Sequence, residues 1–180
     1  MTIIQAFRRD ELDIRNHERI TNEAKALELV AQNTDIPVPR LIEHGIHDDG
    51  RRYLVTQRIY GITLDRIGQT GCMAPFGRAH TSEGRCRTCI KDAHGTARIF
   101  IENSVIPRLY GMWSHERGID GFEMPPSWLV PDTQPPWKGN KAAFKTLPLP
   151  GRRYNFQHGD LGAFNIMMDR HTLQVKALLG

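Results

Sequence analysis

The sequence lacks any long hydrophobic run, and this absence excludes a membrane-spanning helix. No apolar stretch approaches the roughly 20 residues that are needed to cross a bilayer. The first segment, "MTIIQAFRRDELD", has few apolar residues before its charges begin. It does not have the pattern of a secretory signal peptide, and we expect neither secretion nor a membrane partner.

The sequence also has few cysteines and no run of basic residues. Its three cysteines are an odd number and too few for a secreted disulfide scaffold, so we expect a reducing, cytoplasmic location. The net charge is +4, but basic residues occur as isolated pairs such as Arg8–Arg9 and Arg51–Arg52. This pattern favours a solvated surface, and we predict no nucleic-acid partner.

What the chain does contain is typical of one globular domain or of two small lobes. It has 180 residues, of which 39% are hydrophobic and 24% are charged. Residues 1–7 predict a strand and residues 18–33 a helix. The prolines of "IPVP" then enforce extended backbone, and a turn at 47–50 leads into a strand over 51–59. The predicted apolar face of the helix consists of Ile20, Ala24, Leu27, Val30 and Ala31.

The remainder of the chain is less regular. Residues 68–90 are rich in glycine, serine, threonine and cysteine and predict an insertion without regular structure. A helix is predicted over 88–113, and Pro107 should kink or end it. Residues 118–152 carry seven prolines and predict irregular backbone, whereas residues 165–179 predict a strand, a turn and a second strand. The apolar stripe of the helix consists of Ile90, Ala93, Ala97, Phe100, Ile101, Val105 and Leu109.

The segment "FQHGDLGAFNIMMD", residues 156–169, places a histidine, an aspartate and an asparagine in one short loop. Phosphoryl transfer requires a carboxylate that orients or deprotonates the attacking hydroxyl, and oxygen ligands that hold magnesium on the phosphates. Asp160 supplies the carboxylate and Asn165 supplies one metal ligand. The alternative is a polar turn between two core strands, because glycine, aspartate and asparagine favour turns in any case.

This loop resembles the catalytic loop of aminoglycoside phosphotransferases and related small-molecule kinases, and the resemblance extends to two other segments. "NEAKALELVAQNTDIPVPRLIEHG" resembles the helix C of that family with its following strand, and "YLVTQRIYGITLD" resembles the inter-lobe hinge. The three matches occur in the family's order and cover about a third of the chain. The insertion and the proline-rich region look most similar to fungal members.

The resemblance implies an α+β fold of the protein-kinase-like, two-lobed type, in an incomplete form. Residues 1–60 would form a partial N-lobe of strands with helix C. Residues 61–180 would form a partial C-lobe that carries the insertion 68–90 and the catalytic loop 156–169. The implied cofactors are ATP and Mg²⁺, and the implied partner is a small-molecule substrate with a hydroxyl group.

The same resemblance gives roles to individual residues. Asp160 corresponds to the catalytic base, His158 organises the loop, and Asn165 is a magnesium ligand. Glu23 in "NEAKAL" matches the glutamate that pairs with the nucleotide-binding lysine; the alternative for it is a solvated helix residue. The hinge backbone that hydrogen-bonds adenine corresponds to Gln57, Arg58 and Ile59.

Three departures from the family pattern indicate a member that is truncated at both ends. No glycine-rich segment precedes Phe7, and only Arg8 and Arg9 stand where the nucleotide-binding lysine belongs. The magnesium-binding aspartate of the family's Asp-Trp-Glu corresponds to Gly180. We therefore expect a phosphotransferase impaired by truncation. The alternative is a non-catalytic, kinase-like remnant that binds a nucleotide or a partner.

All three cysteines lie in the insertion, together with a histidine. Cys72, His80, Cys86 and Cys89 have the spacing Cys-x7-His-x5-Cys-x2-Cys, which places four zinc-type ligands within 18 residues. This pattern predicts a closed, structural Zn²⁺ site that fastens a loop with little core of its own. His94 is a substitute ligand in this interpretation. The alternative is three unremarkable thiols and a surface histidine.

Overall fold

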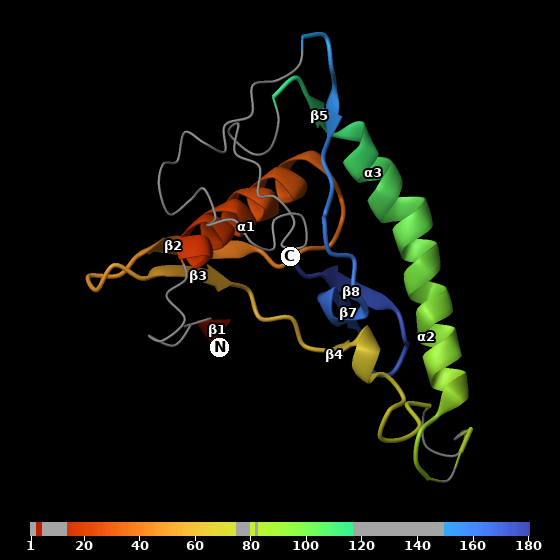
Figure 1. Cartoon of the computed structure of the whole chain (residues 1–180). Helices are drawn as coiled ribbons and strands as arrows, with labels where there is room; N and C mark the ends of the chain where they lie inside the picture. Colours follow the sequence, from red (N-terminus) through yellow and green to blue (C-terminus); the bar gives the residue numbers. More distant parts are fainter. Residues whose placement is uncertain (1–2, 5–13, 75–79, 82, 117–149) are drawn as a thin grey trace, which may run out of the picture.

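The computed structural model describes residues 3–4, 14–74, 80–81, 83–116 and 150–180. Within them the chain has a mixed α and β fold with three small antiparallel sheets and two long helical segments (Figure 1). The sequence prediction of an α+β fold is confirmed at this level. Most of the proline-rich region 118–152 lies outside the described residues.

The first sheet is built from the N-terminal part of the chain. Its order is β1 (Ile3–Ile4), β3 (Arg52–Thr56) and β2 (Leu41–Ile46), and both pairings are antiparallel. The helix α1 (Ile14–Asn33) contacts β2 and β3. It begins four residues before the predicted 18–33, and the hairpin between β2 and β3 agrees with the predicted turn.

A small hydrophobic cluster holds α1 on this sheet. Its buried members are Ile20, Ala24 and Leu27 from the helix and Leu54 from β3. These residues have the i, i+4, i+7 spacing of one helix face. The prediction that Ala31 belongs to that face is wrong, because Ala31 is exposed one turn beyond Leu27, the last helix residue in the cluster.

The second sheet combines a segment from the middle of the chain with the C-terminal hairpin. Its order is β4 (Ile62–Thr63), β7 (Ile166–Met168) and β8 (Val175–Leu178). The turn of the hairpin is closed by Asp169, whose carboxylate accepts hydrogen bonds from two backbone amides at 2.9 and 3.0 Å. These bonds lower the pKa of Asp169 to about 2. The predicted strand, turn and strand are therefore confirmed.

A helical rod runs along one side of the molecule (Figure 1). It consists of α2 (Arg87–Phe100), a π-helical segment (Ile101–Val105) and α3 (Ile106–Gly111). Of the two predicted effects of Pro107, a kink or an end of the helix, the end is wrong, since α3 continues past Pro107 to Gly111. Proline lacks an N–H and crowds the preceding turn, and the wider π-helical segment directly before α3 relieves this conflict.

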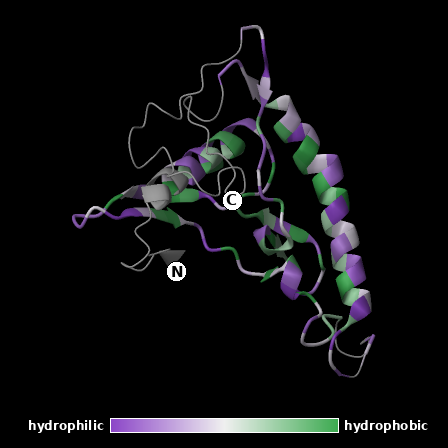
Figure 2. Cartoon of the chain, in the orientation of Figure 1, coloured by the Kyte–Doolittle hydropathy of each residue, from purple (hydrophilic) through white to green (hydrophobic). Residues whose placement is uncertain are grey.

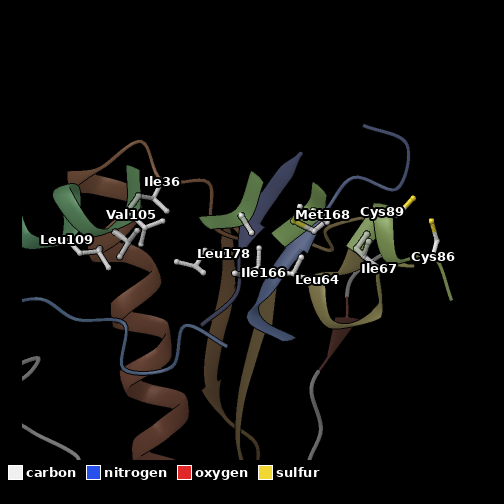
Figure 3. Close-up of a cluster of buried hydrophobic side chains, with 13 residues drawn as sticks. Ile36, Leu64, Ile67, Cys86, Cys89, Val105, Leu109, Ile166, Met168 and Leu178 are labelled. Carbon is white, nitrogen blue, oxygen red and sulfur yellow. The ribbon is translucent and has the colours of Figure 1, made fainter. Parts of the chain in front are cut away.

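The main hydrophobic core lies between the rod and the second sheet (Figure 3). Hydrophobic and hydrophilic residues alternate along the rod (Figure 2), and its buried side chains include Ala93, Ala97, Val105 and Leu109, as the predicted stripe requires. Full burial of an aliphatic side chain stabilises the fold by about 1.5–3 kcal/mol. The complete set of buried members is Val30, Ile36, Leu64, Ile67, Cys86, Cys89, Ala93, Ala97, Val105, Leu109, Ile166, Met168 and Leu178.

Polar contacts link the remaining elements to this core. Arg108 of α3 forms a two-pronged ion pair with Asp35, just beyond α1, and it also donates to the carbonyl of Ser104 at 3.2 Å. After α3, the strand β5 (Trp113–Ser114) pairs with β6 (Tyr154–Asn155). Across the residues that the structure describes, every helix is too short or too polar to span a membrane.

Candidate functional site

The Cys/His cluster lies where the insertion meets the first turn of α2. Cys72 and His80 come from the chain after the 3-10 helix η2 (Leu64–Arg66). Cys86 is the residue immediately before α2, and Cys89 lies in its first turn. Figure 3 shows both of these cysteines at one end of the main core. The structure thus brings together all four residues that the sequence predicted.

The ligand atoms of the cluster have the separations of a tetrahedral metal site. The Sγ atoms of Cys72 and Cys89 are 3.7 Å apart. The Nδ1 atom of His80 lies 3.7 Å from Sγ of Cys72, 3.8 Å from Sγ of Cys86 and 3.5 Å from Sγ of Cys89. A tetrahedral zinc ion requires about 3.8 Å between two sulfurs and about 3.5 Å between a sulfur and a nitrogen. The cluster can therefore hold a metal ion.

Backbone amides donate hydrogen bonds to the sulfur atoms of Cys72 and Cys89. The N–H groups of His80 and Ala74 donate to Sγ of Cys72 at 3.3 and 3.4 Å and lower the pKa of Cys72 to about 6. Burial has the opposite effect on Cys89 and raises its pKa to about 11, although Met73 N–H donates to its sulfur at 3.3 Å. A cation is therefore required to hold the sulfur of Cys89 as a thiolate at neutral pH.

The cluster has the composition of a closed, structural site. Four protein ligands complete a tetrahedron, and three of them are thiols that form no disulfide. Cys86 and Cys89 are buried in the core, with 1% and 0% of their surface exposed. His94, the substitute ligand predicted from the sequence, lies outside the cluster, because it is an exposed residue five positions after Cys89 on α2.

The sequence prediction missed Gly68, which positions the cysteine pair. Its carbonyl accepts a hydrogen bond from the N–H of Cys86 at 2.7 Å. Its φ of +63° lies in the left-handed region, and a Cβ at this position would approach the Cys86 carbonyl oxygen to 2.7 Å and a Cγ of Ile90 to 2.9 Å. The close approach of two backbone segments requires glycine here.

Gly68→Ala is expected to destabilise the chain by about 2–5 kcal/mol and to weaken metal binding. Left-handed strain contributes about 1–2 kcal/mol and the steric contact with the Cys86 carbonyl contributes the rest. The matched control is Gly84→Ala, since Gly84 has φ +70° but nothing within 4 Å of its Cβ position. Urea unfolding and metal titration of both variants check the difference. Equal losses in the two variants would contradict the positioning role.

The His-Gly-Asp loop is tied to the end of the C-terminal strand through His158. Its Nε2 donates to the carbonyl of Leu179 at 2.8 Å, and its Nδ1 accepts from the N–H of Asp160 at 3.3 Å. These two bonds require a neutral imidazole with the proton on Nε2. Between them, Gly159 has a φ of +78°, which allows the sharp turn.

Asp160 and Asn165 are joined by hydrogen bonds across the loop. The side-chain amide of Asn165 donates to the backbone carbonyl of Asp160 at 2.9 Å and to its carboxylate at 3.2 Å. Asn165 ends the 3-10 helix η6 (Ala163–Asn165), and its backbone carbonyl accepts from the N–H of Leu179 at 2.7 Å. The carboxylate of Asp160 is exposed, whereas Asn165 is half-buried.

Glu23 lies beside the residue that follows Leu179. A Cβ added to Gly180 would be 3.5 Å from Cγ of Glu23 and 3.8 Å from its Oε1. Leu179, which precedes Gly180, is hydrogen-bonded to both His158 and Asn165. A series of contacts through Gly180 and Leu179 therefore links Glu23 to the loop.

The predicted hinge residues form the connection from β3 to β4. Gln57, Arg58 and Ile59 have no regular secondary structure. The N–H of Gln57 donates to the carbonyl of Arg40 at 2.8 Å, and the guanidinium of Arg58 lies 5.0 Å from the centre of the Tyr60 ring. This segment joins the first sheet to the second sheet.

Comparisons with known proteins identify no relative. No protein-family model, no curated protein and no solved structure matches the chain.

Proposed function

We propose that the chain is a protein-kinase-like small-molecule phosphotransferase of the aminoglycoside phosphotransferase type, which acts in the cytoplasm and binds ATP with Mg²⁺. The observation that supports this proposal best is the series of contacts from Glu23 through Gly180 and Leu179 to His158 and Asn165. Two carboxylates and one amide are the oxygen ligands and proton acceptors that magnesium-dependent phosphoryl transfer uses.

Each loop residue has a role that follows from its contacts. Asn165 donates its amide hydrogens to Asp160, which leaves its side-chain oxygen as the group available to a cation. The exposed carboxylate of Asp160 accepts the proton of a substrate hydroxyl. His158 holds the loop backbone through Leu179 and acts as a positioning residue. The acceptor is a hydroxyl group on a small molecule.

A second candidate function is nucleotide binding without phosphoryl transfer. It is favoured by the glycine at position 180, because this residue has no side-chain carboxylate to place beside Glu23. Fewer anionic ligands hold magnesium less tightly, and the metal neutralises the triphosphate in this chemistry. The two functions differ in whether magnesium strengthens ATP binding.

We also propose that Zn²⁺ occupies the Cys72/His80/Cys86/Cys89 cluster as a structural metal. Three thiolates and one imidazole are a typical zinc ligand set, and the sulfur–sulfur and sulfur–nitrogen distances fit that ion. The metal would fasten the insertion to α2 and to η2. Elemental analysis of protein purified without chelator should find about one zinc per chain.

The test of the phosphotransferase proposal is calorimetric ATP binding with and without Mg²⁺. We expect magnesium to raise the ATP affinity of the wild-type chain at least about tenfold, because Asn165 would hold the cation and the cation would neutralise charge on the phosphates. Asn165→Ala should lose this gain. Asp160→Asn should keep the binding and lower phosphoryl transfer by about 10²–10⁴-fold.

The control is Asp65→Asn, which removes an exposed carboxylate on η2 outside the loop and should change neither quantity. ATP affinity that is the same with and without magnesium would contradict the phosphotransferase and support the second function. A chain that binds no ATP under either condition would contradict both functions.

A further inference from the structure

The three sulfurs of the metal cluster differ in their access to solvent. Cys86 and Cys89 have 1% and 0% of their surface exposed, whereas Cys72 is only half-buried. An oxidant that approaches from solvent therefore reaches Cys72 first. Solvent access is one of the properties that make a cysteine susceptible to oxidation, and of the three cysteines Cys72 has the most.

The sulfur of Cys72 also has a partner within reach. Its Sγ lies 3.7 Å from Sγ of Cys89, and a disulfide requires about 2.0 Å. The two sulfurs therefore need to approach each other by less than about 2 Å. Cys72 lies in the irregular chain before α2, so its segment can make this adjustment while Cys89 stays in the core.

We propose that hydrogen peroxide converts Cys72 and Cys89 into a disulfide and releases the metal. The attachment of the insertion to α2 through the metal would then depend on the redox state of these two cysteines. This inference rests on the proposed zinc site. The Cys72 thiolate attacks one peroxide oxygen and the O–O bond breaks. Hydroxide is the leaving group, and Cys72 becomes a sulfenic acid. The Cys89 thiolate then attacks that sulfur and displaces a second hydroxide.

The atoms and electrons of this reaction balance. Two thiolates lose two electrons to one peroxide, and with two protons the products are one disulfide and two waters. Only Cys86 and His80 are left as ligands, which is half of the tetrahedron that a structural zinc site needs. The ion therefore leaves. A dithiol reductant restores both thiolates and allows zinc to bind again.

The disulfide can be identified by peptide mapping, because trypsin places each of the three cysteines in a different peptide. Cleavage after Arg66, Arg78, Arg85, Arg87 and Lys91 places Cys72 in residues 67–78, Cys86 in residues 86–87 and Cys89 in residues 88–91. Zinc-loaded full-length protein is treated with hydrogen peroxide, and released zinc is followed with a chromogenic chelator. The protein is then alkylated and mapped by mass spectrometry without reduction.

We expect a cross-linked pair of peptides 67–78 and 88–91, with about one zinc ion released for each linkage and recovery of zinc binding after reduction. Met73 lies in the same peptide as Cys72 and is itself oxidisable. Met73→Leu, a volume-conserving change, should therefore leave zinc release unchanged.

Four outcomes would overturn the inference. Zinc that stays bound while peroxide is consumed would overturn it, and so would a linkage between peptides 86–87 and 88–91; neither would contradict the assignment of zinc to the cluster. Zinc release through irreversible sulfinic acid on Cys72 would do the same. Protein that holds no zinc before peroxide is added would overturn the zinc assignment and this inference together.

Discussion

His80→Ala is expected to abolish zinc binding and to lower the melting temperature by at least about 10 °C. Structural zinc sites bind with apparent free energies of about 10–16 kcal/mol in small peptides, and loss of one ligand removes most of that contribution. In a chain of this size about 1 kcal/mol corresponds to a shift of 2–4 °C. Because His80 is exposed, its removal leaves no cavity in the core, and the effect reports on the metal alone.

The matched control for this prediction is His94→Ala, the other histidine near the cluster. His94 is exposed on α2 and takes no part in the cluster, so the variant should keep its zinc and its melting temperature. Elemental analysis and calorimetric melting measure both quantities. A chelator should lower the melting temperature of the wild-type chain to that of the His80→Ala variant. A His80→Ala protein that retains zinc would contradict the assignment.

Gly180→Asp is expected to raise the magnesium-dependent affinity for ATP at least about tenfold, a change of about 1.4 kcal/mol. The new side chain adds a carboxylate beside Glu23 and next to the loop of Asp160 and Asn165. Its Cβ would have ordinary contacts, because the nearest atom is Cγ of Glu23 at 3.5 Å. Without magnesium the two neighbouring carboxylates repel each other and ATP, so the affinity should then fall.

Gly180→Asn provides the control, since it has nearly the same shape and no charge. It should leave the magnesium dependence of ATP binding close to that of the wild type. Calorimetric titrations at several magnesium concentrations separate the two variants. If both variants behave alike, the region around Glu23 and position 180 does not hold magnesium, and the phosphotransferase proposal loses its main support.

Regular patterns in the sequence predicted most of the elements. Ala93, Ala97, Val105 and Leu109 of the predicted apolar stripe are buried in the structure, and the C-terminal hairpin forms within the residues 165–179 where it was predicted. The cysteine spacing predicted which residues form the metal cluster. In each case neighbouring residues along the chain determine the outcome, because helix periodicity and short ligand spacing are local properties.

Other features depend on contacts between distant segments, and local patterns do not encode them. Gly68 is required because the carbonyl of Cys86 approaches it, and the position of Glu23 beside Gly180 depends on how α1 and β8 lie together. The continuation of the rod past Pro107 depends on a π-helical segment whose sequence has no special signal. Ala31 has helical spacing but no neighbour to cover it.

The position of two cysteines of the cluster at the start of α2 has a consequence for folding kinetics. The first turn of a helix is the slow and unfavourable step, since several backbone dihedral angles must be fixed for one hydrogen bond, with a nucleation constant of about 10⁻³. Cys86 and Cys89 span that turn, and the N–H of Ile90 already donates to the Cys86 carbonyl at 3.2 Å. A metal ion bound there would hold the nucleus of α2 together, so that the rod could grow from the cluster toward α3.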